Sequence, residues 1–212
     1  MGNKNPLTYQ PINPLTSKPM NHYDDLLRIE PTGLSLEAGR LLVSTPYFND
    51  PFFNHSVVLL TDYEDEHTAG LIINRQLPHS VYDVVNEIRV DDPIYFGGPV
   101  LPEAVFLLHS FDSCPEATRL LPGVYVGYNP VLIAVLEQHA IPNLKSKFLL
   151  GYAGWSPGQL EDELERNMWV VAPATQSLVF DTPADEIWTR TVRRLGPRYE
   201  HWLRIPKNIA YN

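Results

Sequence analysis

Cysteine is almost missing from this sequence, because Cys114 is the only one among 212 residues. A single thiol excludes an internal disulfide and a metal cluster held by thiolates. The seven histidines show no H-x-x-H or H-E-x-x-H spacing, so no metal site is expected. The sequence also lacks a P-loop and a G-x-G-x-x-G motif, and it therefore predicts no cofactor.

Long apolar runs and excess positive charge are also missing. No run approaches the roughly 20 residues that span a bilayer, and the start of the chain lacks the apolar core of a signal peptide. Lys and Arg number 16 against 25 Asp and Glu, which gives a net charge of −9. This balance disfavours direct nucleic-acid binding and attraction to anionic membranes. We therefore expect a cytoplasmic protein without a membrane partner.

The amino-acid composition changes along the chain and predicts an N-terminal arm, one domain and a C-terminal tail. Residues 1–32 are rich in Pro and Asn, have no sustained hydrophobic period, and are expected to form an extended arm. Residues 33–205 have the texture of one α/β domain, and residues 206–212 form a short tail. Hydrophobic residues make up 44% of the chain, enough for a sizeable core.

Within the domain, β-branched and apolar runs alternate with turn signals and helical patterns. Strands are expected over 40–44, 56–63, 70–75, 93–98, 104–110, 123–128, 147–154 and 168–172. Helices are expected over 80–88, from Asn129-Pro130 onward, over 157–167, and from a Thr182-Pro183-Ala184-Asp185 cap to Gly196-Pro197. This order predicts a single compact α/β domain with a mixed, largely antiparallel sheet flanked by helices.

The segment Gly154-Trp155-Ser156-Pro157-Gly158 matches the G-x-S-x-G pattern of a serine nucleophile. The next residue, Pro157, has no N–H to give an oxyanion hole, and it disfavours a strained turn at Ser156. A helix start explains the pattern better, with Ser156 as N-cap and Gln159 closing a capping box. Replacing Ser156 with Ala is then expected to cost about 1 kcal/mol of stability.

Four stretches together resemble one known family. They read "DPFFNHSVVLLTDYEDEHTAGLIINR", "IYFGGPV", "FLLHS" and "GYAGWSPGQLEDEL". In this order they resemble the YqgE/AlgH family of bacterial proteins, often named as transcriptional regulators, from about Leu41 to about Leu195. The resemblance implies a mixed α/β fold and a cytosolic location, and no known reaction. Gln76 stands where that family usually has Pro, and the Pro-rich arm is longer than the family's usual start.

The polar and glycine residues of the resembling motifs lie at or just beyond predicted strand ends, where α/β sheets place their crevices. The candidate binding residues are Asp50, Asn74, Arg75, Gly97, Gly98, His109, Ser110, Trp155, Gln159 and Glu161. Five of them are expected to line one crevice beside a helix N-terminus: Asn74, Arg75, His109, Trp155 and Gln159. A guanidinium, an imidazole and a helix N-terminus would favour an anion. Each residue also has a structural interpretation, in which Arg75, for example, ties down its neighbouring loop through Asp50.

Three functions stay open. The first is binding of a small anionic ligand or a protein partner, without catalysis. The second is a hydrolase that uses His109 with carboxylates. The third is a direct DNA-binding regulator, as the names in the resembling family suggest. The net acidity and the lack of a recognition helix count against it, and the only feature of the sequence in its favour is a C-terminal group of arginines at positions 190, 193, 194, 198 and 204. The lack of a catalytic motif favours the first, and the sequence does not predict the oligomeric state.

Overall fold

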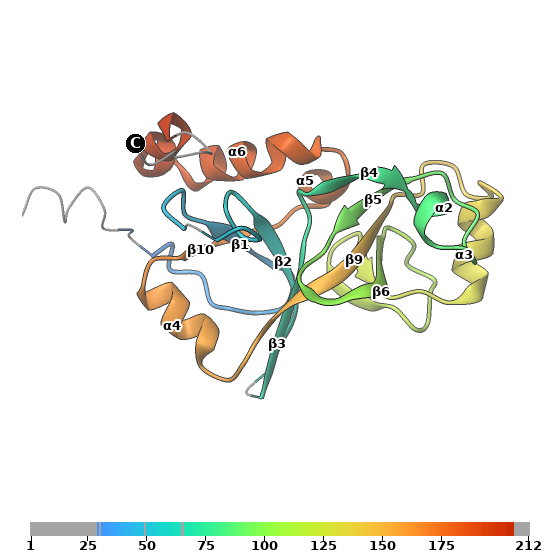
Figure 1. Ribbon diagram of the computed structural model, residues 1–212, viewed down its shortest axis with the longest axis horizontal. Helices are drawn as coiled ribbons and strands as arrows, with labels where there is room; N and C mark the ends of the chain where they lie inside the picture. The colour runs from blue at the N-terminus through green and yellow to red at the C-terminus, as the bar shows by residue number, and fades with distance from the viewer. Residues whose placement is uncertain (1–28, 30, 49, 65, 206–212) are drawn as a thin grey trace, which may run out of the picture.

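A curled sheet forms the centre of the computed structural model, which describes residues 29, 31–48, 50–64 and 66–205 (Figure 1). Most of the predicted arm and the whole predicted tail lie outside these residues. In the described part the sheet has ten strands. They are β1 Arg40–Ser44, β2 Val57–Glu64, β3 His67–Ile72, β4 Gln76–Ser80, β5 Pro93–Phe96, β6 Val100–His109, β7 Thr118–Leu121, β8 Val124–Val126, β9 Ser146–Trp155 and β10 Trp169–Pro173.

The strand order is β10-β1-β2-β3-β9-β6-β8-β7, and β5 joins β9 to β4 beside this path. Every pairing in the described chain is antiparallel except that of β5 with β9, which is parallel. β2 and β3 follow each other in the chain and form a hairpin, with Leu59 opposite Leu71. The largely antiparallel mixed sheet expected from the sequence is therefore confirmed.

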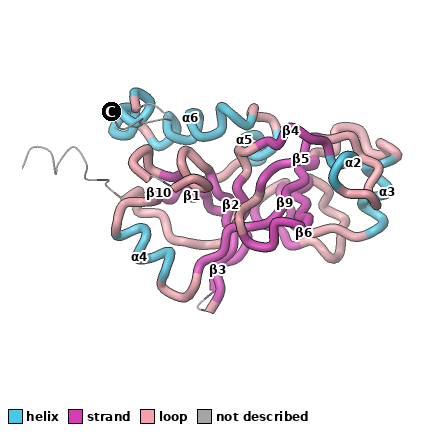
Figure 2. The backbone as a smooth tube through the Cα atoms, in the orientation of Figure 1, coloured by secondary structure: helices cyan, strands magenta, loops and turns pink. Residues whose placement is uncertain are grey.

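Helices cover the outside of the sheet (Figure 2). They are α2 Val81–Val84, α3 Pro130–Glu137, α4 Gln159–Glu165, α5 Gln176–Phe180, α6 Ala184–Leu195 and the 3₁₀ helix η1 Pro197–Arg204. Each group of helices closes a separate cluster of buried side chains. The first lies under α5, α6 and η1, the second under α4, and the third under α2 and α3.

The connection from β5 to β6 passes across another strand of the sheet. β5 and β6 lie on either side of β9, so the chain between them must cross that strand. Gly97 and Gly98 make the crossing: a Cβ on Gly97 would meet the carbonyl oxygen of Gly151 at 2.2 Å, and one on Gly98 would meet the backbone of Tyr152 at 2.1 Å. Only glycine fits where two backbones approach so closely.

The helix starts confirm some predicted caps and contradict others. Asn129 caps α3 as predicted, since its Oδ1 accepts the N–H of Leu132 at 2.9 Å. The prediction for Ser156 is wrong, because α4 begins at Gln159 with Gly158 as a left-handed N-cap, and Ser156 provides no side-chain cap. The Thr182 cap is also wrong: its hydroxyl donates to the carbonyl of Ser177, and α6 begins at Ala184.

Candidate functional site

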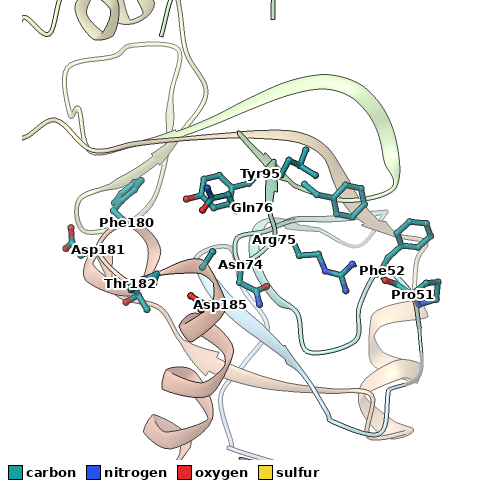
Figure 3. A pocket seen from close by; sticks show the side chains of 14 residues that line it. Pro51, Phe52, Asn74, Arg75, Gln76, Tyr95, Phe180, Asp181, Thr182 and Asp185 are labelled. Atoms are coloured by element: carbon teal, nitrogen blue, oxygen red, sulfur yellow. Dashed lines mark hydrogen bonds between the residues drawn. The ribbon is translucent and has the colours of Figure 1, made fainter. Parts of the chain in front are cut away.

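A groove of about 890 Å³ opens at the surface between four segments that are far apart in sequence. They are residues 51–52 before β2, 74–77 from the end of the β3–β4 connection into β4, 95–96 of β5, and 180–185 from the end of α5 into the start of α6 (Figure 3). Arg75, Phe52 and Pro51 lie on one side of the groove, and Asp181 and Thr182 on the other. The site is therefore built where sheet ends and a helix connection meet.

Asn74 fixes the floor of the groove. Its Oδ1 accepts the N–H of Val57 at 2.8 Å, and its Nδ2 donates to the carbonyl of His55 at 2.9 Å. Both groups of the amide are thus used by the backbone that enters β2. Asn74 consequently links the segment after β3 to the loop before β2 through two hydrogen bonds.

Arg75 extends from this floor and is half-buried. Its Nη1 donates to the carbonyl of Pro51 at 2.9 Å, and its Nη2 donates to that of Asn54 at 3.2 Å. A guanidinium has five N–H donors, and that of Arg75 forms no other hydrogen bond within the described chain. Burial lowers the pKa of Arg75 while the nearby Asp50 charge raises it. The group stays charged, because an arginine guanidinium does not deprotonate in proteins.

Asp50 shapes the loop instead of lining the groove. Its Oδ1 accepts the N–H groups of Phe52 at 2.8 Å and Phe53 at 3.0 Å. The loop is thus tied to Arg75 through the carbonyls of Pro51 and Asn54, and not through a salt bridge with Asp50.

Aromatic side chains line much of the groove. Phe52, which is 43% exposed, stacks on Phe96 with ring centroids 5.8 Å apart. Tyr95 and Phe180 add two more rings deeper in the groove. Exposed aromatic surface beside a charged group is typical of a site that binds a small molecule or a partner side chain.

The opposite wall carries carboxylates. Asp181 forms a salt bridge with Lys145, 2.9 Å from Nζ to Oδ1, which links the α5–α6 connection to the segment before β9. Asp185 lies in the first turn of α6 and also lines the groove. Its charge lies across the groove from that of Arg75 (Figure 3).

A buried lysine lies behind the groove. The Lys147 side chain is 4% exposed, its Nζ donates to the carbonyl of Ile73 at 3.0 Å, and it lies 4.4 Å from the centroid of the Tyr95 ring. Burial lowers its pKa to about 8. Lys147 was not among the predicted site residues, although a lysine at the start of the apolar run "KFLLGYAG" was a visible signal. The contributions of Tyr95, Phe180 and Asp185 had no such signal, because only tertiary structure brings them to the groove.

The predicted single crevice is wrong. Of its five residues, only Asn74 and Arg75 line the groove. His109 pairs with Ser146 at the start of β9, whereas Trp155 ends the same strand nine residues later, about 30 Å away for an extended chain. The expectation relied on a rule for parallel strands, whose carboxyl ends share one edge. Here the neighbours β6 and β9 are antiparallel, so their last residues lie at opposite edges.

His109 is fully buried and stacks on Tyr125 with ring centroids 5.7 Å apart. The N–H of Phe111 donates to its Nδ1, while its Nε2 has no hydrogen-bond partner in the described chain. Burial lowers its pKa, which favours the neutral ring. The neighbouring Ser110 accepts the N–H of Lys145 at 2.9 Å and thereby fixes the strand end.

The residues around α4 form their own network. Glu163 Oε2 accepts the indole N–H groups of Trp155 at 2.8 Å and Trp169 at 2.7 Å. Gln159 donates to the other oxygen of Glu163, and its own oxygen accepts the N–H of Ser156. Glu161 accepts the hydroxyl of Tyr63 at 2.6 Å. These contacts explain three predicted site residues by packing between α4 and the sheet.

Two further features of the described residues bear on possible sites. No group of three or more His, Cys, Asp or Glu side chains in this part of the chain is arranged to hold a metal ion. None of its helices is long and apolar enough to cross a membrane.

Comparison with solved structures gives the same fold in two bacterial proteins. A crystal structure from Corynebacterium diphtheriae matches with a TM-score of 0.69 at 23% identity, covering 82% of this chain and 94% of that one. The solution structure of the AlgH protein from Pseudomonas aeruginosa matches with a TM-score of 0.64 at 30% identity, covering 76% and 89%.

Comparison of the sequence with known proteins also gives bacterial relatives. A UPF0301 protein of Bacteroides thetaiotaomicron is 32% identical over 197 residues, which is 91% of this chain and all of the relative. A UPF0301 protein of Chlorobaculum parvum is 34% identical, over 77% of this chain and 89% of the relative. The family model described as AlgH-like matches residues 41–200. The chain belongs to the AlgH-like family.

Proposed function

We propose that this protein acts by binding, and that its groove takes a small anionic ligand or the acidic side chain of a protein partner. The observation that carries the proposal is the Arg75 guanidinium, which lines the groove with two of its five N–H donors held by Pro51 and Asn54. A planar guanidinium fixed in this way is suited to a carboxylate or a phosphate.

The fixed position of Arg75 matters because binding costs less when the recognising group is already ordered. The carbonyls of Pro51 and Asn54 hold the guanidinium in place before any ligand arrives. The hydrogen bonds of Asn74 fix the backbone next to Arg75. The stacked rings of Phe52 and Phe96 would contact the apolar part of the occupant. An occupant with an anionic group and an apolar body fits both features.

The experiment compares Arg75→Gln with Arg119→Gln, which removes the same charge from the exposed strand β7. Binding of inorganic phosphate, citrate and a short Asp/Glu peptide is followed by chemical shifts of groove amides. We expect binding by the parent and by Arg119→Gln, and at least tenfold weaker binding by Arg75→Gln. Equal binding by all three proteins would refute a role for Arg75 in recognition.

The two alternatives have less support. A hydrolase built on His109 would need a ring that reaches substrate, and this ring is fully buried and does not line the groove. For DNA binding, Arg190 is paired with Glu186 at 2.6 Å, and Arg194 donates to the hydroxyl of Thr175. These contacts, with the net charge of −9, favour a partner surface over a nucleic-acid surface. We also propose a cytoplasmic location, which fractionation of cells would test.

A further inference from the structure

We propose that Lys147 is a second, inner cationic contact of the groove, that Tyr95 is the gate over it, and that the occupant is a small dianion of the dicarboxylate type. This inference rests on the proposed function, because it assumes that Arg75 holds one anionic group. It adds a second anionic group, which Lys147 binds once the Tyr95 ring turns aside.

The first support is that the Lys147 charge is buried and has no counter-ion among the residues that the structure describes. An ammonium has three N–H donors, and the described chain provides one acceptor, the carbonyl of Ile73 at 3.0 Å. No described carboxylate forms a salt bridge with it; its described contacts are the carbonyl of Ile73 and the ring of Tyr95. Its lowered pKa, about 8, has burial as its cause. A buried charge without a partner is costly, and such groups gather at functional sites.

The second support is the position of the ammonium. Its two contacts are the carbonyl of Ile73, the residue before the groove residue Asn74, and the ring of Tyr95, which itself lines the groove. Lys147 itself does not line the groove, and Tyr95 is the groove residue whose ring it contacts. A turn of that ring would expose two N–H donors directly to an anion in the groove, where the low dielectric strengthens the attraction.

The third support is that a purely structural role does not explain why the residue at position 147 is charged. The carbonyl of Ile73 needs one donor, and a neutral donor would satisfy it without burying a charge. A long apolar side chain would fill the same volume at lower cost. An anion that neutralises the charge would account for a lysine at this position, which the bond to Ile73 and the contact with Tyr95 alone do not require.

The role of the Lys147 charge is tested with two variants. Lys147→Met keeps the approximate shape of the side chain without its charge, and Arg119→Gln is the control, because it removes a distant charge. Binding of glutarate and adipate is compared with that of butyrate, by chemical shifts and calorimetry. We expect the parent to bind at least one dicarboxylate at least tenfold more tightly than butyrate. In Lys147→Met, which should be at least as stable as the parent, this advantage should disappear while butyrate binding is kept.

The gate is tested by acylation of Lys147 with acetic anhydride, read as peptide modification by mass spectrometry. The amine should react slowly in the parent and in Tyr95→Phe, at least fivefold faster in Tyr95→Ala, and slowly again in Tyr95→Ala with the dicarboxylate. Anion binding that needs Arg75 but shows the same dicarboxylate preference in Lys147→Met would overturn this inference and leave the proposed function standing. No anion binding by the parent would overturn both.

Discussion

Arg75 holds the carbonyl oxygen of Pro51 at 2.9 Å from its Nη1, and so joins the end of β3 to the loop before β2. The second nitrogen does the same for Asn54, so one side chain orders a whole loop. Recognition and loop order therefore depend on the same group, and experiments on Arg75 must measure both.

The first prediction concerns the stability of Arg75→Ala. We expect a loss of about 1–2 kcal/mol, because two carbonyls lose charged donors while partial exposure lets water replace them. Urea unfolding measures this loss. Arg119→Ala, an exposed arginine on β7, should stay within about 0.5 kcal/mol of the parent. A loss of similar size in both variants would show that general charge, and not the loop contact, is responsible.

The second prediction concerns Glu163, whose single oxygen accepts two indole N–H groups. Glu163→Ala leaves both buried donors without a partner and should lower stability by about 2–3 kcal/mol. The tryptophan emission should also change, since Trp155 and Trp169 are both involved. Glu165→Ala, on the same helix but exposed, is the control and should have little effect. An unchanged emission spectrum in Glu163→Ala would contradict the network.

The third prediction concerns Ser156. Because Gly158 is the N-cap and the Ser156 hydroxyl caps nothing, Ser156→Ala should change stability by less than about 0.5 kcal/mol. A fluorophosphonate probe should leave the protein unlabelled, since Pro157 removes the N–H that an oxyanion hole needs. Labelling that disappears in Ser156→Ala would restore the nucleophile interpretation.

The wrong prediction for Ser156 shows that a local sequence pattern does not by itself determine the residue at which a helix begins. Ser-Pro-Gly-Gln fits a capping box residue by residue, and half of that box is present, because Gln159 accepts the N–H of Ser156 at 3.1 Å. The left-handed backbone of Gly158, φ 76°, then starts the helix two residues later than predicted. A glycine two residues after the serine permits both starts, and tertiary packing chooses between them.

Strands were easier to predict than their arrangement. Buried apolar runs such as "RLLVS" and "SVVLL" carry their own hydrophobic signal, and β1 and β2 appear there. β4 was missed because it is short, contains a proline and is mostly exposed, and β7 was missed because it has only four residues, two of them exposed. Whether neighbouring strands run parallel is a property of connections, so the sequence could place Arg75 and His109 at strand ends but not at a common edge.

The fourth prediction concerns the crossing at Gly98. A Cβ there would lie 2.1 Å from a backbone carbon of Tyr152, so two backbones would have to separate, and Gly98→Ala should cost more than about 3 kcal/mol. Gly158→Ala is the matched control, because it has the left-handed φ but nothing within 4 Å of its Cβ. Backbone strain alone should cost it about 1–2 kcal/mol. Similar losses in both variants would mean that the crossing tolerates a side chain.

The fifth prediction concerns the pH dependence of stability that Lys147 causes. Its pKa is lowered by burial to about 8 in the folded protein, against 10.5 in the unfolded chain. Between these values the unfolded chain binds the extra proton, so stability rises with pH. The rise attributable to Lys147 should be about 2 kcal/mol between pH 7 and pH 9.5. The range stops there because the pKa of Tyr95 is raised by burial, and its ionisation above pH 10 favours unfolding.

Lys147→Met isolates this effect, since every other titrating group is unchanged and cancels in the difference. At pH 7 the variant avoids burying a charge but loses the bond to Ile73 and the contact with Tyr95. These opposing effects should leave it about 1–2 kcal/mol more stable than the parent. The advantage should shrink as the pH rises, because the parent lysine becomes neutral. A variant that is less stable at pH 7, with the same difference at pH 9.5, would mean that folding does not lower the pKa of Lys147 and that burial of its charge does not destabilise the protein.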